Sequence, residues 1–261
     1  MGQQRQHLQR QQTDHGSVSS EASQIERRRQ FGWKLTRMWR RFFVRLQCPA
    51  VTKPLTEKPD LDDSLAAFVL AGGKSSRMGR DKATLSLHGR TLLQLALSTL
   101  REITGNVSIL GSPQIYGDQG APVIPDIIPE CGPLSGIHAA LTHTRAAYNL
   151  IMAVDTPFLS ADFLRFLTSR AVAAGTVITT PEIAGYTQPL CTVYSRQFLP
   201  IAAHALKSGE YKIVPLFPRE STLTISEAEM AQFAFTPEMF DNLNTPEDLE
   251  RARLRSLANK R

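Results

Sequence analysis

Short apolar runs alternate with segments of helical periodicity from about residue 64 to residue 258. The runs with the length and composition of buried strands are 65–70, 107–110, 150–154, 176–180 and 190–194. Apolar residues recur at helical spacing in 91–103, in 134–144 and in a segment that Ser160 caps and that ends at Ala174. Strands that alternate with helices favour an α/β fold, a three-layer α/β/α sandwich around a mostly parallel sheet.

A last helix is predicted near the end of the chain. Thr245 supplies a cap, Pro246 occupies the first helical position, and Glu247 places an acid in the first turn. The body is long enough for one sizeable core. We therefore expect one domain over residues 61–261, preceded by an extension over residues 1–60. Ligands of such sheets bind beyond the carboxyl ends of the strands, so functional residues are expected in the segments that follow them.

The extension and the body differ in charge. Residues 1–60 carry 12 Lys and Arg against five Asp and Glu, whereas residues 61–261 carry 18 against 19. The basic pI of about 9.4 therefore belongs to the extension. It gives no reason to expect that the body binds nucleic acid.

The extension contains one candidate element. Residues 1–24 are rich in Gln, Ser and His, a composition typical of disorder. Residues 26–47 carry an apolar stripe at helical spacing: Phe31, Leu35, Met38, Phe42 and Leu46. Basic side chains lie largely off that stripe, so the segment is a candidate amphipathic helix that contacts anionic lipid or a partner. An unstructured tail is the open alternative.

Membrane and cysteine signals point to the cytoplasm. No apolar run approaches the length of a membrane span, and the basic stretch is not followed by the apolar core of a signal peptide. The three cysteines, Cys48, Cys131 and Cys191, are odd in number and lack metal-ligand spacing. We therefore predict a cytoplasmic protein with free thiols.

The strand at 65–70 opens into the most informative segment, Leu70-Ala71-Gly72-Gly73-Lys74-Ser75-Ser76-Arg77-Met78-Gly79-Arg80-Asp81-Lys82. Glycines are expected to leave backbone N–H groups free, and the cations converge in one loop. These features predict a polyphosphate cradle, with an ordinary basic turn as the alternative. Phe68 stands where a P-loop has its first glycine, and Gly72 and Gly73 are adjacent, so neither a P-loop nor a dinucleotide fingerprint is present.

Carboxylates follow two further strands. Asp126 precedes a Pro/Gly loop that leads into a helix, and a carboxylate there can accept the paired N–H groups on the N1 and N2 edge of guanine, which cytosine lacks. Asp155 follows the strand at 150–154, and Mg²⁺ bound to a triphosphate usually takes one or two such carboxylates. A turn-stabilising role is the alternative for each. Asn242 and Asn244 precede the last helix, where a capping role and a site role are both open.

These segments together resemble the molybdenum cofactor guanylyltransferases of the nucleoside-triphosphate transferase superfamily. The resemblance covers residues 66–250 and rests on the loop 70–82, on Asp126 with Gly132-Pro133-Leu134-Ser135-Gly136, and on Asn242-Leu243-Asn244-Thr245-Pro246-Glu247-Asp248-Leu249. It implies a Rossmann-like nucleotidyltransferase domain. Relatives that use CTP typically carry Ala-Ala-Gly where this chain has Ala71-Gly72-Gly73. One departure is Gly111, where the family often has an asparagine that contacts the nucleotide.

The resemblance also implies roles for named residues. Nucleotide binding falls to Leu70, Ala71, Gly72, Gly73, Lys82, Asp126 and Asp155. Catalysis falls to Arg77, Lys82 and Asp155, and Mg²⁺ binding to Asp155 and Asn244.

The implied reaction transfers GMP from GTP to molybdenum-bearing molybdopterin, giving the guanine dinucleotide form of the cofactor and pyrophosphate. GTP, molybdopterin and an apo-molybdoenzyme or its chaperone are the implied partners. Two alternatives are open. The first is a related transferase that uses CTP with molybdopterin, or that uses a sugar or alcohol phosphate as the acceptor. The second is a non-catalytic module that delivers the cofactor.

Overall fold

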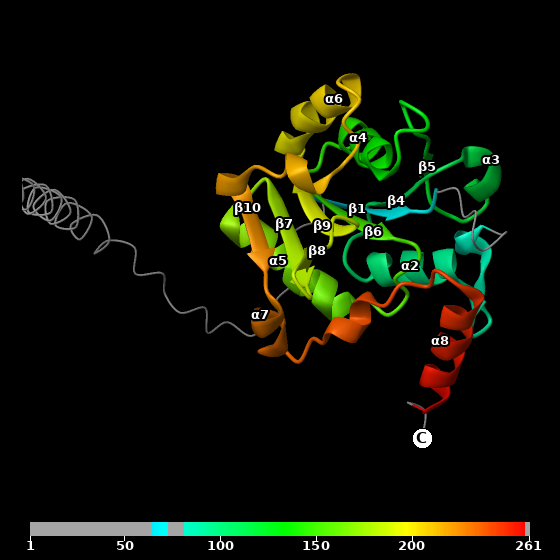
Figure 1. Ribbon diagram of the computed structural model, residues 1–261. Coiled ribbons are helices and arrows are strands. Elements are labelled where there is room, and N and C mark those ends of the chain that lie inside the picture. The colour runs from blue at the N-terminus through cyan, green and yellow to red at the C-terminus, as the bar shows by residue number, and fades with distance from the viewer. Residues whose placement is uncertain (1–63, 73–80, 259–261) are drawn as a thin grey trace, which may run out of the picture. The chain divides into compact units, whose positions relative to one another are not determined.

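The computed structural model describes residues 64–72 and 81–258 and shows a sheet between two layers of helices (Figure 1). The strands of this sheet are β1 (Leu65–Leu70), β4 (Val107–Leu110), β5 (Val123–Ile124), β6 (Tyr148–Ala153), β7 (Ile178–Ile183), β8 (Tyr186–Thr187), β9 (Cys191–Ser195) and β10 (Thr222–Ile225). Their order is β10-β7-β9-β6-β1-β4-β5, and β8 pairs with β7. The predicted mostly parallel α/β/α sandwich is confirmed.

Strand direction divides the sheet at β9. The neighbours β5, β4, β1 and β6 are parallel, as are β7 and β10. β9 is antiparallel to both β6 and β7, and β8 is antiparallel to β7. The continuous parallel part of the sheet therefore lies on the β6 side of β9, and it contains the strands that carry the predicted site.

The principal helices are α2 (Leu92–Arg101), α4 (Pro133–His143), α5 (Ala161–Ala174) and α6 (Leu199–Lys207). α4 and α6 cover one face of the sheet, and α2 and α5 the other (Figure 1). β1 contributes Ala67 and Val69 to the core with α2 and α5, and Phe68 and Leu70 to the core with α4 and α6. Successive strand side chains point to opposite faces, and β1 is buried on both, which accounts for its uninterrupted apolar sequence.

Smaller elements connect and flank these layers. They are the helices α3 (Pro113–Tyr116), α7 (Glu227–Ala231) and α8 (Pro246–Ala258), the hairpin strands β2 (Ser86–Leu87) and β3 (Arg90–Thr91), and the 3-10 turns η1 (Lys82–Thr84), η2 (Arg196–Phe198), η3 (Val214–Leu216), η4 (Arg219–Ser221) and η5 (Pro237–Phe240). The predicted cap of α5 is confirmed, because the Ser160 side chain accepts a hydrogen bond from Phe163 N at 3.2 Å.

Several predictions fall outside the described residues. The extension over residues 1–60, its candidate helix at 26–47, and the loop residues Gly73 and Arg77 are among them. Across the stretches that are described, no helix combines the length and apolarity needed to cross a membrane. Cys131 and Cys191 are buried free thiols.

Candidate active site

The carboxyl ends of four parallel strands lie in register along one side of the sheet, which we call the carboxyl edge. Leu70 of β1 pairs with Leu110 of β4 and with Ala153 of β6, and Leu110 pairs with Ile124 of β5. The segments that leave this edge hold Ala71 and Gly72, Gly111, Asp126 and Asp155. The sheet therefore brings residues that are far apart in the sequence to one edge.

Lys82 is the centre of the charged part of this edge. Its Nζ donates a hydrogen bond to Asp155 Oδ2 at 2.8 Å and another to Asn244 Oδ1 at 2.6 Å. The side chains of Lys82 and Asp155 are only 20% and 21% exposed, so water screens the ion pair incompletely while a ligand can still reach it. Two oxygen atoms from different segments thus converge on one cation.

A cap holds Lys82 at the start of η1. Asp81 is the N-cap, and its Oδ1 accepts a hydrogen bond from Ala83 N at 3.0 Å. The Asp81 carbonyl oxygen accepts a second bond from the Thr84 hydroxyl at 2.8 Å. Since these bonds fix the backbone on both sides of Lys82, its side chain leaves a constrained turn.

Main-chain hydrogen bonds place Asn244 beside Asp155. Leu243 N donates to the Asp155 carbonyl oxygen at 2.9 Å, and Val154 N donates to the Leu70 carbonyl oxygen at 3.1 Å. The segment before α8 is therefore joined to the end of β6, which is itself joined to β1.

The hydrogen bonds at the start of α8 show which residue caps the helix. The Thr245 hydroxyl accepts from Asp248 N at 3.1 Å, and Asp248 Oδ2 accepts from Asn244 N at 3.0 Å and Thr245 N at 2.8 Å. Thr245 is thus the cap, and the Asn244 side chain is turned to Lys82. Asn242 instead lines a cavity of about 490 Å³ that includes neither Lys82 nor Asp155 in its lining.

The pKa of Asp248 reports the same arrangement. The amide N–H of Asn244 is the main cause that lowers the pKa of this carboxyl, opposed by partial burial and reinforced by Arg251 and Thr245. A carboxylate that accepts several N–H bonds favours its charged form. Asp248 therefore remains ionised at neutral pH and continues to hold the backbone of Asn244.

Asp126 lies at the other end of the edge, over the first turn of α4. A Cβ atom at Gly136 would lie 3.7 Å from Asp126 Oδ1 and 2.6 Å from Leu70 Cδ1, so the helix approaches the carboxylate and β1 closely at a residue without a side chain. Desolvation raises the pKa of the Asp126 carboxyl, and a hydrogen bond from Ser135 opposes this. The residue as a whole is exposed, so its carboxylate is desolvated on one side and open to a ligand on the other.

One expectation about the loop is wrong for its first glycine. Glycines were expected to leave backbone N–H groups free, but Gly72 N donates to the Leu110 carbonyl oxygen at 3.3 Å, as Ala71 N does at 3.0 Å. These bonds continue the β1–β4 ladder past the last strand residue. The donors that remain for a phosphate would have to come from Gly73 onwards, which lies outside the described residues.

One residue near the carboxyl ends of these strands was not predicted. Tyr116, on the four-residue helix α3, places its hydroxyl 2.7 Å from Asp81 Oδ2 and 3.0 Å from the Ala71 carbonyl oxygen. Its ring packs on Gly111, the position where the family often has asparagine. A single tyrosine in a short helix has no pattern that marks it as functional, so only its contacts identify it.

Oxygen ligands for a metal are present, although they are few. Within residues 64–72 and 81–258, no group of three or more His, Cys, Asp or Glu gathers that could hold a metal ion. Asp155 and Asn244 nevertheless direct two oxygen atoms at the Lys82 ammonium. Hard oxygen donors of this kind suit Mg²⁺, which keeps most of its shell for water and phosphate.

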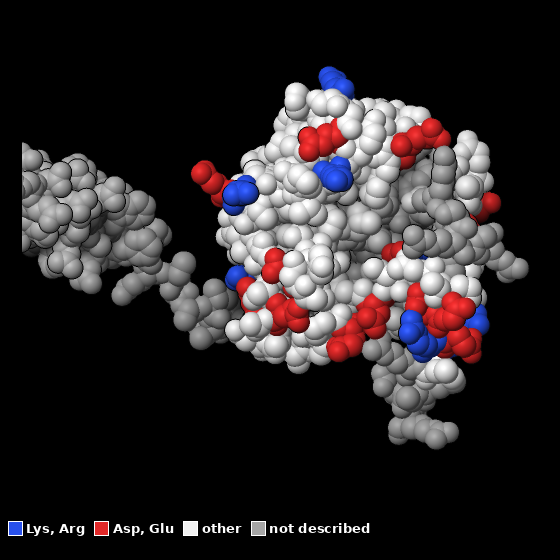
Figure 2. Space-filling view, viewed as in Figure 1, with Lys and Arg blue, Asp and Glu red and all other residues white. Residues whose placement is uncertain are grey.

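Charge on the body is uneven. Acidic side chains gather along the lower part of the face drawn in Figure 2, over α7 and the start of α8, where Glu227, Glu229, Glu247 and Asp248 lie. Residues 220–250 contain eight Asp and Glu and no Lys or Arg. Lys82 brings a positive charge to the carboxyl ends of the strands, and the sequence of the loop before it adds Lys74, Arg77 and Arg80.

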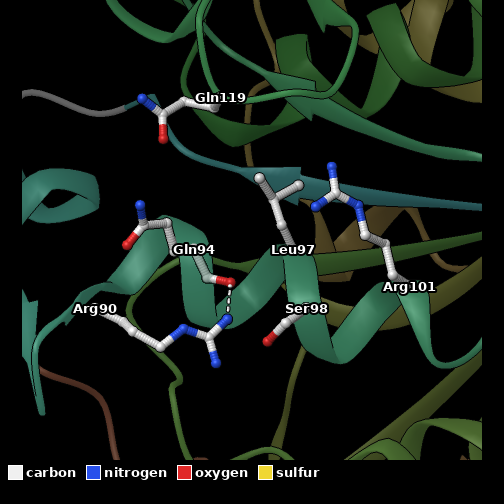
Figure 3. A pocket seen from close by; sticks show the side chains of 6 residues that line it. All are labelled: Arg90, Gln94, Leu97, Ser98, Arg101 and Gln119. Atoms are coloured by element: carbon white, nitrogen blue, oxygen red, sulfur yellow. Dashed lines mark hydrogen bonds between the residues drawn. The ribbon is translucent and has the colours of Figure 1, made fainter.

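A further cavity lies away from these residues. The cavity has a volume of about 400 Å³ and is lined by Arg90, Gln94, Leu97, Ser98, Arg101 and Gln119 (Figure 3). Arg90 donates to the Gln94 carbonyl oxygen at 2.9 Å and Arg101 to that of Gly120 at 2.7 Å. None of the predicted nucleotide, metal or catalytic residues lines it, so it is not part of the candidate active site.

Comparisons with known proteins identify the family. A family model described as the MobA-like NTP transferase domain matches residues 67–221. A probable molybdenum cofactor guanylyltransferase of Pelotomaculum thermopropionicum is 33% identical over 187 residues, which are 71% of this chain and 90% of that protein. A molybdenum cofactor guanylyltransferase of Desulfosudis oleivorans is 32% identical over 194 residues, 73% of this chain and 95% of that protein.

Solved structures show the same likeness. The molybdopterin-guanine dinucleotide biosynthesis protein A of Archaeoglobus fulgidus superposes with a TM-score of 0.64 at 25% identity, covering 75% of this chain and all of that one. A 2-C-methyl-D-erythritol 4-phosphate cytidylyltransferase of Thermus thermophilus reaches a TM-score of 0.55 at 15% identity, covering 73% of this chain and 98% of that one. The second likeness concerns the fold alone.

Proposed function

This chain belongs to the family of MobA-like NTP transferase domains and is a nucleotidyltransferase, and we propose that it transfers GMP from GTP to the phosphate of molybdenum-bearing molybdopterin. The products are the guanine dinucleotide form of the cofactor and pyrophosphate. The observation that carries the proposal is the convergence of Lys82, Asp155 and Asn244 at the carboxyl edge of the sheet.

The distance between Asp126 and Asp155 suits one nucleotide bound across the carboxyl ends of the strands. Asp126 follows β5 and Asp155 follows β6, and the two strands are separated by β4 and β1. Three inter-strand spacings amount to about 14 Å. A base at Asp126 and phosphates at Lys82 and Asp155 would therefore occupy opposite ends of the edge, with the ribose near Ala71 and Gly72.

The residues would act by positioning and by charge. The Asp126 carboxylate accepts the N1 and N2 hydrogens of guanine. A phosphate oxygen of the acceptor attacks the α-phosphorus in line, a new P–O bond forms, and the bond from the α-phosphorus to the bridging oxygen breaks as pyrophosphate leaves. Lys82 leaves its ion pair with Asp155 to neutralise charge on the α-phosphate and the leaving group. Arg77, which lies outside the described residues, is proposed to assist.

Asp155 and Asn244 would hold Mg²⁺ through their oxygen atoms. A bound Mg²⁺ would supply charge neutralisation to the triphosphate. The protein's contribution is to aim the two oxygen donors, and the hydrogen bonds of Leu243 N and Asp248 do so.

The proposed function can be tested by comparing the binding of different nucleotides and the transfer rates of variants. Isothermal titration with GTP, CTP, ATP and UTP should show preferential binding of GTP, and guanylyl transfer should release pyrophosphate only when molybdopterin is present. Lys82→Ala should lower the rate on the order of 10²-fold, the usual loss when one such stabilising charge is removed. Lys207→Ala, an exposed lysine at the end of α6, is the matched control. Preferential CTP binding, or normal turnover by Lys82→Ala, would contradict the proposal.

Cellular partners follow from the same proposal. A cytoplasmic location fits the buried free thiols Cys131 and Cys191. We also propose that the product passes to an apo-molybdoenzyme or its chaperone. Capture of such a protein by the wild type but not by a chain that begins near Asp60 would assign the delivery step to the extension.

A further inference from the structure

Tyr116 joins the two sides of the loop that carries the phosphate-binding motif. Its hydroxyl lies 3.0 Å from the carbonyl oxygen of Ala71, near the start of the loop 70–82, and 2.7 Å from Asp81 Oδ2, near its end. The side chain is 4% exposed. One buried hydroxyl therefore lies within hydrogen-bond distance of both the Ala71 carbonyl oxygen and the Asp81 carboxylate, which are ten positions apart in the sequence.

Gly111 makes this placement of the ring possible. A Cβ atom at position 111 would lie 2.7 Å from Cε2 of Tyr116, closer than real Cβ contacts come, and 3.0 Å from Cδ2, which is also tight. The tyrosine ring thus occupies the space that an asparagine side chain would need. Burial, and after it Asp81, raises the pKa of the Tyr116 phenol, so the hydroxyl stays protonated and remains a donor.

Asp81 connects the hydroxyl to Lys82. While Oδ2 faces Tyr116, Oδ1 accepts from Ala83 N at 3.0 Å and caps η1. Lys82 is the first residue of η1, and its Nζ contacts Asp155 and Asn244. Rotation of the Asp81 carboxylate would release the cap and the backbone from which Lys82 projects.

We propose that Tyr116 is a positioning residue for nucleotidyl transfer, whose hydroxyl orients Asp81 and thereby aims Lys82 at the reacting phosphates. The proposal rests on the proposed function for the role of Lys82. The aim of the lysine itself depends only on contacts among described residues.

The first test removes the hydroxyl and keeps the ring. Tyr116→Phe should lower kcat for GMP transfer about tenfold, because a small misplacement of a catalytic group is costly, while KM for GTP changes less than about threefold. Tyr148→Phe is the matched control, since this tyrosine begins β6 at the opposite edge of the sheet. Both variants are assayed well below their melting temperatures, so that a loss of kcat reports on the active site and not on unfolding.

A double-mutant cycle tests the route through Asp81. If the hydroxyl acts through the carboxylate, Tyr116→Phe combined with Asp81→Ala should be no slower than Asp81→Ala alone. Rate losses that multiply in the double variant, or an unchanged kcat in Tyr116→Phe, would overturn the proposal.

A crystallographic readout is independent of the substrate. In the Tyr116→Phe structure Lys82 Nζ should leave Asp155 Oδ2, and a contact retained at the present 2.8 Å would overturn the positioning role. Wild-type protein without guanylyl transfer would contradict the proposed function instead. The two failures are therefore distinguishable.

Discussion

At the scale of single residues, the carboxylate of Asp126, which we propose binds the base, is held at a cost in stability. Its pKa is raised by desolvation, so the folded state favours the neutral acid and the ionised carboxylate is unfavourable at pH 7. We expect Asp126→Asn to weaken GTP binding about tenfold, because a charge-assisted pair of hydrogen bonds is lost. CTP binding should not change. Titration calorimetry with both nucleotides measures the difference.

The same substitution makes a stability prediction with a defined sign. Since the folded pKa is raised, the stabilising contribution is present below the ordinary value of 3.8 and is lost as the pH rises through the folded pKa. Asp126→Asn should therefore unfold at a temperature equal to or above that of the wild type at pH 7. As the pH falls towards 4, the melting temperature of the wild type should rise relative to that of the variant. A variant that is less stable at pH 7 would contradict the direction of the shift.

Gly111 gives a prediction about packing. Gly111→Ala should destabilise the protein by about 1–3 kcal/mol, the usual cost of overpacking, because the new Cβ meets the Tyr116 ring. Gly105→Ala is the control, since no atom lies within 4 Å of the position its Cβ would take. Urea unfolding of both variants compares them. Equal midpoints would mean that the ring moves away without cost.

At the scale of elements, the start of α8 sets the orientation of Asn244, one of the two residues proposed to bind Mg²⁺. Asp248→Ala removes the acceptor of Asn244 N and Thr245 N, so the Asn244 oxygen should lose its orientation. We expect the Mg²⁺ concentration for half-maximal activity to rise several-fold, about fivefold, as for other supporting contacts of metal ligands. Glu250→Ala, which removes an exposed pair with Arg253 on the same helix, is the control.

The pH dependence of this variant has the opposite sign to that of Asp126. The Asn244 amide lowers the pKa of Asp248, so its contribution to stability is present above the ordinary carboxyl value and is lost as the pH falls through the folded pKa. The difference in melting temperature between wild type and Asp248→Ala should therefore shrink below about pH 4. A constant difference from pH 7 to pH 3 would show that the carboxylate's charge is not what matters.

Elements with strong local signals were predictable from the sequence. The run at 107–110 coincides with β4, and Ser160 caps α5 as expected, because a buried strand and a capped helix each have a short-range pattern. The direction of β9 and the pairing of β10 with β7 were not, since an apolar run is the same sequence whether its neighbours are parallel or antiparallel. The two-residue strands β5 and β8 are too short to show a period.

The same division applies to the candidate site. Lys82, Asp126, Asp155 and Asn244 were named from motifs, because each follows a strand or precedes a helix in a recognisable segment. Tyr116 was not, since its role depends on a distance across the fold to Asp81. Whether Asn244 or Thr245 caps α8 also required the side-chain geometry, because both residue types suit the position.

At the scale of the whole molecule, every described site residue lies after residue 64, and the sheet that aligns them needs only strands of the body. We therefore expect a chain that begins near Asp60 to keep kcat and KM for guanylyl transfer within about twofold of the full-length values, since every motif residue lies after the extension. Steady-state assays of the two proteins measure this. A larger loss would assign the extension a part in catalysis.

The extension should instead decide attachment to a surface. Residues 1–60 carry a net charge of +7, and the body carries −1. Near an anionic membrane each arginine of a helix at 26–47 contributes about 1 kcal/mol before screening. The full-length protein should therefore pellet with phosphatidylserine liposomes at low salt and be released at high salt, whereas the shortened chain should stay in the supernatant. Equal pelleting of both, with no helical signal from the 26–47 peptide on lipid, would contradict the amphipathic helix and leave the tail without a membrane role.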